Sequence, residues 1–417
     1  MKELVSLRCD PTNLRKCSIR LTKGLEKGLW VQLSATEGPH EVIPHQLLPL
    51  GPGIIIASGG SYGGAQQCLL PRSHLDKSAK ATGKWLLSQG LEPQSCLVLN
   101  PLPFHHVSGL MPWWRSRSWE CKHQWLISSL IRNPIQLEKF CKSIFRKHTG
   151  PLLVSLVPTQ LHRLINHPAG LSWLQAFDVI WIGGSALPAE LAENARRKKI
   201  RLAPCYGATE TTAMVTVLSP DAFLTGESGC GNPLEDVSLR INSNGALEVK
   251  TPRLAKAAWK DGHLKNINNK NGWWQSGDLA QLTLKNCLYH LEILGRLDTA
   301  IHSGGETIFP EQLETKLITV IKQHGLPIEK ILLLPIHDKE WGQRLIALVK
   351  LEGPLTTVSQ IEYIDYLKRI VRTWPPAERP LAWLQCSELT PNNLDKWERS
   401  KWEGWMKKNL SKNPINS

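Results

Sequence analysis

The stretch GRLDTAIHSGGETIFPEQLE, residues 295–314, joins a Gly-Arg-x-Asp cluster to paired glycines and a Pro-Glu-x-x-Glu segment. Glycines permit backbone conformations with positive φ, which suit a tight turn or a close approach to a ligand. Pro310 stands where a helix can begin, and acidic side chains in a first helical turn are favoured by the helix dipole. Taken alone, the stretch predicts a strand, a turn and a helix with an exposed charged face.

Length and composition indicate a globular protein of two or three domains. The chain has 417 residues, of which 41% are hydrophobic and 21% charged, and this length exceeds one ordinary domain. Lysine and arginine total 50 against 36 acidic residues, a formal charge of +14. Such a balance favours polyanionic partners: nucleic acid, an anionic membrane surface or phosphorylated small molecules. No basic-aromatic alternation accompanies the 17 tryptophans, so a base-stacking platform is not predicted.

The cysteines and the N-terminal sequence favour a cytoplasmic protein. The ten cysteines occur singly, without a C-x-x-C pair, which disfavours a disulfide framework or a structural zinc site and favours a reducing compartment. Neither a signal-peptide pattern nor an apolar run of membrane-spanning length is present. We therefore expect a cytoplasmic location and no membrane insertion.

Strand patterns alternate with helical patterns through the first half of the chain. Residues 53–57, GIIIA, lead into the glycine-rich loop SGGSYGGAQQ at 58–67, and a helical pattern follows over about 75–88. FDVIWIGGSALP at 177–188 and RLAPCYGATETTAMV at 201–215 repeat this design of a strand that ends in a glycine turn. The order predicts an α/β fold with much parallel sheet. Ligands of such sheets bind at the carboxyl ends of the strands.

The second half of the chain is richer in short strands. Residues 227–285 contain alternating segments and Asn-Gly turns at Asn244-Gly245 and Asn271-Gly272, which predict β-hairpins. Beyond Asp298, helical patterns alternate with strand patterns and describe a small α+β domain. The helical patterns lie at about 310–324 and 358–373, the strand patterns at 330–335 and 345–351, and a basic helix closes the chain.

Three motifs occur together and in a fixed order: YGATET at 206–211, SGD at 276–278 and GRLD at 295–298. With them the chain resembles the adenylate-forming acyl-CoA synthetase superfamily, and the resemblance covers roughly residues 55–405. The glycine-rich loop resembles the phosphate-binding loop of that superfamily. Gln66 stands where the superfamily has a lysine. The loop therefore has one positive charge fewer with which to bind the phosphates.

The resemblance implies the adenylate-forming enzyme fold. It places a large N-terminal α/β domain with a β-rich subdomain at residues 1–297, and a small mobile α+β domain at 298–417. Residues 1–50 would be a shortened first segment, in which no chemistry is recognisable. Asp298 matches the hinge residue on which the small domain turns.

The resemblance also implies roles for individual residues. Thr209 would contact phosphate, Glu210 would hold Mg²⁺, and Lys396 would bridge the carboxylate and the α-phosphate once the small domain has closed. His106 and Gly183 would line the acid pocket. The remaining nucleotide contacts would come from Ser61, Tyr62, Gly63, Gly184, Ser185, Tyr206, Gly207, Asp278 and Arg296.

Within the superfamily, PFHHVSGL at 103–110, VPTQLHRL at 157–164 and WIGGSALP at 181–188 resemble the o-succinylbenzoate–CoA ligases of menaquinone and phylloquinone synthesis. This implies a ligase that converts o-succinylbenzoate to o-succinylbenzoyl-CoA with ATP, Mg²⁺ and coenzyme A, releasing AMP and pyrophosphate. Three alternatives stay open. They are another aryl- or acyl-CoA ligase, for a benzoate or a fatty acid; a non-catalytic binding protein of the same fold, suggested by Gln66; and, ranked lowest, a nucleic-acid-binding protein suggested by charge alone. The oligomeric state is left open.

Overall fold

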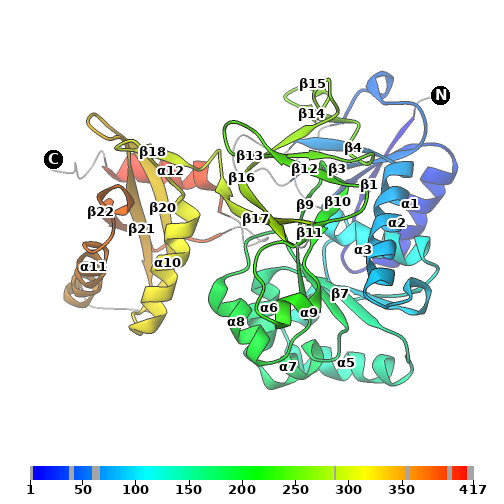
Figure 1. The fold of residues 1–417 in the computed structure, drawn as a ribbon, viewed down its shortest axis with the longest axis horizontal. Helices are drawn as coiled ribbons and strands as arrows, with labels where there is room; N and C mark the ends of the chain where they lie inside the picture. Colours follow the sequence, from blue (N-terminus) through cyan, green and yellow to red (C-terminus); the bar gives the residue numbers. More distant parts are fainter. Residues whose placement is uncertain are drawn as a thin grey trace. The chain divides into compact units, whose positions relative to one another are not determined.

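The structure is a computed structural model that describes residues 3–36, 42–58, 66–285, 288–353, 357–391 and 397–410. Two compact units are present (Figure 1). In the described part of the chain, the first unit comprises the residues up to Ser276 together with Ala280–Ile293. The second unit comprises Gly277–Leu279 and the residues from Leu294 onward.

A six-stranded sheet of the first unit contains the strand predicted at residues 53–57. The isoleucines of β3 are fully buried: Ile54 and Ile56 pack with residues of α1 to α3, and Ile55 packs on the opposite face with Trp30 and Trp259. Strands β1, β2 and β3 are parallel, and β4, β14 and β15 continue the sheet antiparallel. The elements are β1 (Leu4–Arg8), α1 (Leu14–Glu26), β2 (Trp30–Ser34), β3 (Gly53–Ala57), β4 (Gln67–Pro71), β14 (Ala257–Lys260) and β15 (His263–Lys265), in the order β1-β2-β3-β4-β14-β15.

A seven-stranded sheet confirms the α/β fold with parallel strands. Its order is β11-β10-β9-β8-β7-β5-β6, and β6, β5, β7, β8 and β9 are parallel. The strands are β5 (Leu97–Asn100), β6 (Lys122–Trp125), β7 (Leu152–Leu156), β8 (Val179–Ile182), β9 (Leu202–Ala208), β10 (Ala213–Val217) and β11 (Asn232–Pro233).

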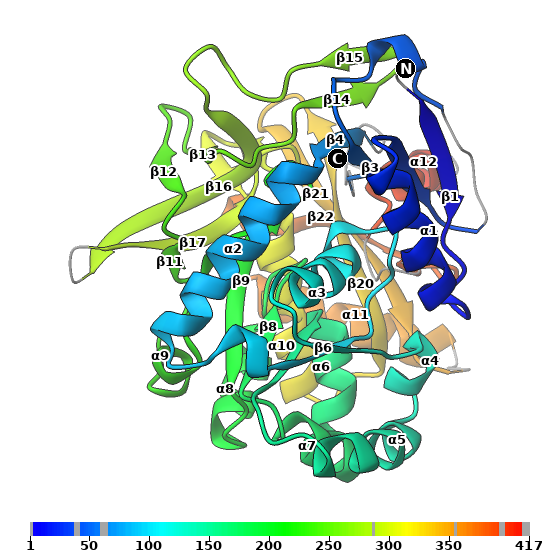
Figure 2. The same ribbon diagram turned by 90° about the vertical axis from the view of Figure 1, so that its right-hand side faces the viewer.

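Helices cover both faces of this sheet. Val154 and Ile180 point to the layer formed by α5 to α9, whereas their neighbours Leu153 and Val179 pack on the face shared with α2. The α5–α9 layer gathers on one side of the sheet in both views (Figures 1 and 2). The helices of the first unit beyond α1 are α2 (Arg72–Ser88), α3 (Val107–Ser118), α4 (Ser128–Ile131), α5 (Pro134–Arg146), α6 (Pro158–Ile165), α7 (Pro168–Leu174), α8 (Ala189–Arg197) and α9 (Pro220–Leu224).

A four-stranded sheet, β12-β13-β16-β17, supplies the predicted β-rich part. Asn244-Gly245 joins β12 to β13 as a hairpin, with Gly245 at φ +77°. The hairpin predicted at Asn271-Gly272 is wrong, because that turn joins β15 to β16, which lie in different sheets. The strands are β12 (Ser238–Ile241), β13 (Ala246–Lys250), β16 (Trp274–Lys285) and β17 (Leu288–Arg296).

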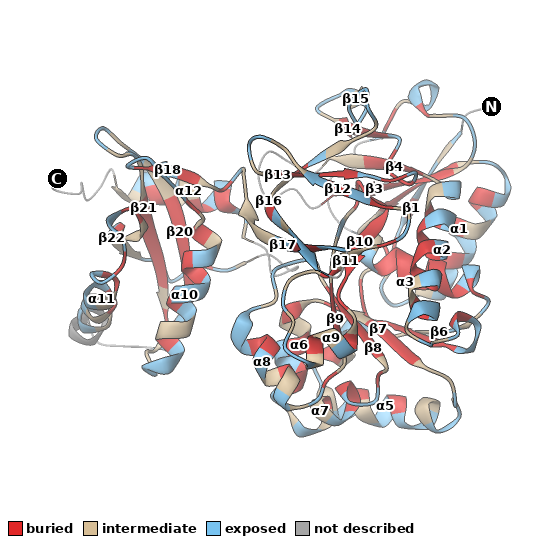
Figure 3. Ribbon diagram, in the orientation of Figure 1, coloured by how far each residue is buried: buried red, intermediate tan, exposed pale blue. Residues whose placement is uncertain are grey.

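The second unit is an α+β arrangement around its own core. Leu333 and Leu345 of the sheet pack with α10 and α11, and Leu334 and Ile346 pack on the other face with α12. Buried residues follow β20 and β21 through the centre of the unit (Figure 3). The elements are β18 (Ile301–Ser303), β19 (Glu306–Ile308), α10 (Pro310–Gln323), β20 (Ile328–Asp338), β21 (Gly342–Leu351), α11 (Thr357–Val371), β22 (Pro380–Gln385) and α12 (Arg399–Leu410).

Helix α10 begins at Pro310, with Glu311 in its first turn, as the sequence predicts. The domain boundary at Asp298 and the mobility of the small domain stay predictions. Across the described ranges, no helix has the length and apolar character needed to cross a membrane.

Candidate active site

The glycine turn after β8 lies beside the end of β9. A Cβ placed on Gly183 would approach the Sγ and the carbonyl oxygen of Cys205 to 3.1 and 3.2 Å, so a missing side chain lets the two strand ends meet. Gly184 has φ +85°, a conformation that glycine adopts without steric cost. Ser185 follows and is exposed, and Tyr206 directly after Cys205 is half-buried. These predicted residues lie together at the carboxyl edge of the parallel strands.

The TETT loop (Thr209–Thr212) joins the antiparallel strands β9 and β10. Its first two side chains are buried, each 7% exposed. Its last residue and Ala213 have φ of +52° and +82°, where a residue with a side chain costs about 1–3 kcal/mol. A Cβ on Gly207 would approach the carbonyl oxygen of Ala213 to 2.4 Å, so glycine is required at that position. The loop is strained and must be held by its surroundings.

The carboxylate of Glu210 lies beside two neutral side chains of the described residues, Gln66 and Cys68. Gln66 donates from Nε2 to Oε1 of Glu210 at 2.6 Å, and the thiol of Cys68 lies beside it, with a pKa that burial and this carboxylate raise well above its usual value. No lysine, arginine or histidine of the described ranges forms an ion pair with Glu210. A buried carboxylate is costly unless a cation compensates it.

This environment fits Mg²⁺. Magnesium is usually bound by one or two carboxylates together with substrate phosphates, and does not need a cage built entirely from the protein. The described residues contain no group of three or more His, Cys, Asp or Glu side chains able to hold a metal. Glu210 therefore fits a Mg²⁺ ligand that acts with the phosphates of a nucleotide.

We expect Gln66→Lys to raise the Mg²⁺ concentration needed for half-maximal activity by about tenfold. A lysine ammonium at this position comes within ion-pair reach of Glu210 and competes with the metal ion. The measurement is a Mg²⁺ titration of AMP release at fixed ATP. Gln66→Met is the matched control, because it keeps the volume and adds no charge. An unchanged Mg²⁺ requirement in Gln66→Lys would show that Glu210 is not the metal ligand.

His106 stands at the carboxyl edge after β5, where α3 begins. Its carbonyl oxygen accepts from the amides of Gly109 and Leu110 at 3.0 and 2.8 Å. The rings of His105 and His106 have centroids 4.3 Å apart, and burial lowers the pKa of His105. Because β5, β7, β8 and β9 run parallel, His106 and Gly183 follow strands that end at the same edge.

The second unit contains a cluster of charged residues near its first residues. Arg296 donates from Nε and Nη2 to the two carboxylate oxygens of Asp298 at 2.8 and 2.6 Å, and its Nη1 lies 3.7 Å from Oδ1 of Asp278. The amide of Leu297 donates to the carbonyl oxygen of Gly277 at 2.7 Å. The SGD and GRLD motifs, distant in the sequence, are therefore in direct contact.

Sequence reasoning missed a buried cation in the first unit. Arg115 on α3 is 3% exposed, and its guanidinium carbon lies 5.1 Å from the ring centroid of Trp181 on β8. Burial lowers the pKa of Arg115 to about 10, with Cys205 close by, so the side chain is charged at neutral pH. No carboxylate of the described ranges forms an ion pair with it. The surrounding letters, MPWWRSRSW, give no sign that this arginine is the buried one.

Four predicted residues lie outside the described part of the chain. They are Ser61, Tyr62 and Gly63 of the glycine-rich loop, and Lys396. Their placement stays a prediction.

Residues 73–253 match the family model for AMP-binding enzymes, and this segment contains the glycine turn, the TETT loop and Arg115. This segment of the chain is similar to the AMP-binding enzymes. The chain is similar to the 2-succinylbenzoate–CoA ligase of Salmonella typhimurium, with 30% identity over 321 residues that cover 76% of this chain and 61% of the relative. It is also similar to the 2-succinylbenzoate–CoA ligase of Escherichia coli, with 29% identity over 311 residues that cover 74% and 59%. The chain thus spans about three fifths of the length of these relatives.

Solved structures of an o-succinylbenzoate CoA synthetase share the fold. The o-succinylbenzoate CoA synthetase of Bacillus subtilis in complex with an acyl-adenylate intermediate aligns with a TM-score of 0.70 at 18% identity, covering 96% of this chain and 88% of that one. The same synthetase with ATP and a magnesium ion aligns with a TM-score of 0.69 at 18% identity, covering 96% and 89%. The predicted adenylate-forming enzyme fold is confirmed.

Proposed function

We propose that this protein is an acid–CoA ligase that activates o-succinylbenzoate through an acyl-adenylate and transfers the acyl group to coenzyme A. The observation that carries the proposal is Glu210, a buried carboxylate on a strained loop of the family segment that forms no ion pair with any described residue. Such a carboxylate suits a metal that is shared with nucleotide phosphates. We infer the identity of the acid from the similar 2-succinylbenzoate–CoA ligases of Salmonella typhimurium and Escherichia coli.

Adenylation must bring two anions together, the carboxylate of the acid and the α-phosphate of ATP. Thr209 would contact phosphate, and Glu210 would hold Mg²⁺, which supplies charge neutralisation on the phosphoryl oxygens when bound. Lys396 would bridge the two anions. Preorganised donors of this kind act on charge that develops during the reaction. The adenine would lie against Tyr206, with the backbone at Gly184, Ser185 and Gly207 beside it.

The second unit would hold the ribose and change position between the half-reactions. Asp278 and Arg296 would bind the ribose hydroxyls and phosphate, and Asp298 would be the hinge. After adenylation, the small domain would turn and bring Ser303–Glu306 to the pocket. This stretch is the tip of the β18–β19 hairpin, where Gly304 and Gly305 both have positive φ. The coenzyme A thiolate would then attack the acyl-adenylate carbonyl, forming the thioester and releasing AMP.

Arg115 favours a substrate with a second carboxylate. It is a buried guanidinium beside Cys205, the residue before Tyr206, and no described carboxylate neutralises it. A buried charge without a partner is costly. Of the two carboxylates of o-succinylbenzoate, one would react with ATP and the other would form an ion pair with Arg115. A benzoate or a fatty acid would leave Arg115 unpaired. His106 and Gly183 would line the same acid pocket.

A non-catalytic binding protein of the same fold is the second candidate. Gln66 favours it, because the phosphate loop lacks the usual lysine. The contacts among Asp278, Arg296 and Asp298 favour an enzyme, as does Glu210, which has no ion-pair partner in the described part of the chain, because a scaffold needs none of these features. The described cysteines are free thiols, which supports a cytoplasmic location as part of the proposal.

The test is a panel of acids assayed with ATP, Mg²⁺ and coenzyme A for AMP and thioester formation. We expect kcat/KM for o-succinylbenzoate to exceed that for benzoate or octanoate by ~10²–10⁴, because a site built around a buried charge rejects ligands that leave it unpaired. Arg115→Met is the matched variant: it should lose the preference and keep the slow reaction with benzoate. A faster reaction with benzoate or octanoate would refute the substrate. The absence of AMP with every acid would favour the binding protein.

A further inference from the structure

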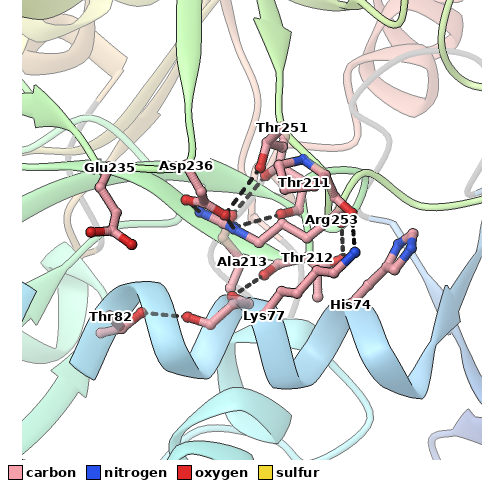
Figure 4. A network of polar contacts seen from close by, with 12 residues as sticks. His74, Lys77, Thr82, Thr211, Thr212, Ala213, Glu235, Asp236, Thr251 and Arg253 are labelled. Carbon is pink, nitrogen blue, oxygen red and sulfur yellow. Dashed lines mark hydrogen bonds and ion pairs between the residues drawn. The ribbon is translucent and has the colours of Figure 1, made fainter. Parts of the chain in front are cut away.

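The side chain of Arg253, a residue that no sequence motif indicates, forms hydrogen bonds with the backbone of the strained TETT loop (Figure 4). Arg253 is fully buried at 0% exposure. It donates from Nη1 to the carbonyl oxygen of Thr211 and from Nη2 to that of Met214, both at 2.9 Å. One guanidinium thus joins the loop at Thr211 to the beginning of strand β10 at Met214.

The backbone around Arg253 adds further contacts. The hydroxyl of Thr212 donates to the carbonyl oxygen of Arg253 at 2.6 Å, and the amide of Ala255 donates to that of Glu210 at 2.7 Å. From α2, the hydroxyl of Ser78 donates to the carbonyl oxygen of Thr212 at 2.6 Å. The carbonyl oxygens of loop residues 210, 211 and 212 are therefore all fixed.

Asp236 orients the guanidinium. Arg253 Nε lies 2.8 Å from Oδ2 of Asp236, and Nη2 lies 3.4 Å from Oδ1. Thr251 donates to the same carboxylate at 3.3 Å. Asp236 thus compensates the charge of Arg253 (Figure 4). Nη1 is directed to the loop at Thr211, and Nη2 to Met214 of β10. The guanidinium is planar and donates in fixed directions, so lysine cannot reproduce all of these bonds.

We propose that Arg253, oriented by Asp236, is a positioning residue for Thr209 and Glu210. The loop adopts left-handed φ at Thr212 and Ala213, and such conformations persist only where the surroundings impose them. Without the hydrogen bonds from Arg253, the loop relaxes and the Glu210 carboxylate moves away from the position of the metal ion. The inference rests on the proposed function, in which Glu210 holds Mg²⁺ beside the phosphates of ATP.

Calorimetric titration of ATP, without acid or coenzyme A, tests this role independently of turnover. Each variant is titrated in EDTA and at a series of Mg²⁺ concentrations, and its melting curve is recorded. Arg253→Met should weaken the Mg²⁺ affinity of the ATP complex by about 10–100-fold, the usual effect of removing a residue that orients a ligand. The affinity for ATP in EDTA should fall by a smaller factor, because Thr209 would contact phosphate without the metal, whereas the nucleotide contacts assigned outside the loop do not depend on Arg253.

Two further variants keep the test decisive if Arg253→Met fails to fold. Arg253→Lys retains the charge beside Asp236 and should restore part of the Mg²⁺ affinity, and Asp236→Asn should lose part of it. Glu235→Gln is the matched control, because Glu235 pairs with Lys84 at the surface, with its side chain 54% exposed. Its Mg²⁺ affinity should equal that of the wild type.

The outcomes separate the two proposals. If the wild type binds ATP in a Mg²⁺-dependent manner and the Arg253 and Asp236 variants show the same Mg²⁺ affinity with lowered melting temperatures, Arg253 is merely structural and the positioning role is overturned. If the wild type shows no Mg²⁺-dependent ATP binding, the proposed function fails as well. A selective loss of Mg²⁺ affinity, graded from Met to Lys, establishes the role.

Discussion

Replacement of Lys396 by alanine is expected to slow acyl-adenylate formation by ~10²–10³, the usual effect of losing one preorganised donor to developing charge. Thioester formation from supplied acyl-adenylate should be almost unchanged. The reason is that Lys396 would lie at the site only while the small domain is closed for adenylation. Pyrophosphate release measures the first step. Synthetic o-succinylbenzoyl-adenylate mixed with coenzyme A measures the second.

The local structure supplies a matched control for Lys396. Arg399, three residues further on, donates to both carboxylate oxygens of Glu314 at 2.9 and 3.0 Å and anchors the beginning of α12. Lys401 lies in the same helix and is exposed, and its ammonium lies 4.8 Å from the ring centroid of Trp402. Lys401→Ala should leave both steps unchanged. An equal loss of both steps in Lys396→Ala would contradict its assigned role.

Asp298→Pro should abolish one half-reaction and spare the other. A hinge residue must adopt a different pair of φ and ψ angles in each half-reaction, and proline fixes φ near −65° and removes the amide hydrogen. The substitution therefore traps one domain orientation. Separate assays of adenylate formation and of its transfer to coenzyme A, with a melting curve, measure the effect.

The carboxylate of Asp298 also accepts two hydrogen bonds from Arg296. The loss of this carboxylate therefore needs a control of its own. Asp298→Ala removes both hydrogen bonds to Arg296 and leaves φ free. If these hydrogen bonds alone matter, the alanine and proline variants will behave alike. If the hinge matters, only the proline variant will separate the two half-reactions. Parallel losses of both steps that follow a lowered melting temperature would refute the hinge.

Sequence patterns predict those helices and strands that are determined by residues close together in the chain. The β-branched run at 53–57 forms β3 with the expected bounds, and α10 begins at Pro310, where the missing amide hydrogen costs nothing. The segment before residue 50 was not recognised, although it forms β1, α1 and β2. Its helix buries Cys17, Leu21 and Leu25, a four-residue spacing that is typical of a helix. The helical pattern is weak in the sequence because Cys17 takes the place of a larger apolar residue and lysines and arginines surround it.

Contacts between distant residues could not be predicted in this way. Gln66 and Glu210 are separated by 144 residues and Arg253 and Thr211 by 42, and neither pair has a motif that links its members. Which arginine is buried depends on the whole fold, so Arg115 and Arg253 have no local signal. The motifs located the TETT loop, whereas the residues that hold it in place required the structure.

The most direct test of the acyl-adenylate route is to trap the intermediate. The protein is incubated with o-succinylbenzoate, Mg²⁺ and ATP labelled at the α-phosphate, without coenzyme A, and the products are separated after acid quench. We expect o-succinylbenzoyl-adenylate and pyrophosphate in equal amounts, and conversion of the label to AMP when coenzyme A is added. Formation of ADP, or of AMP only after coenzyme A is present and with no labelled intermediate before it, would contradict the account.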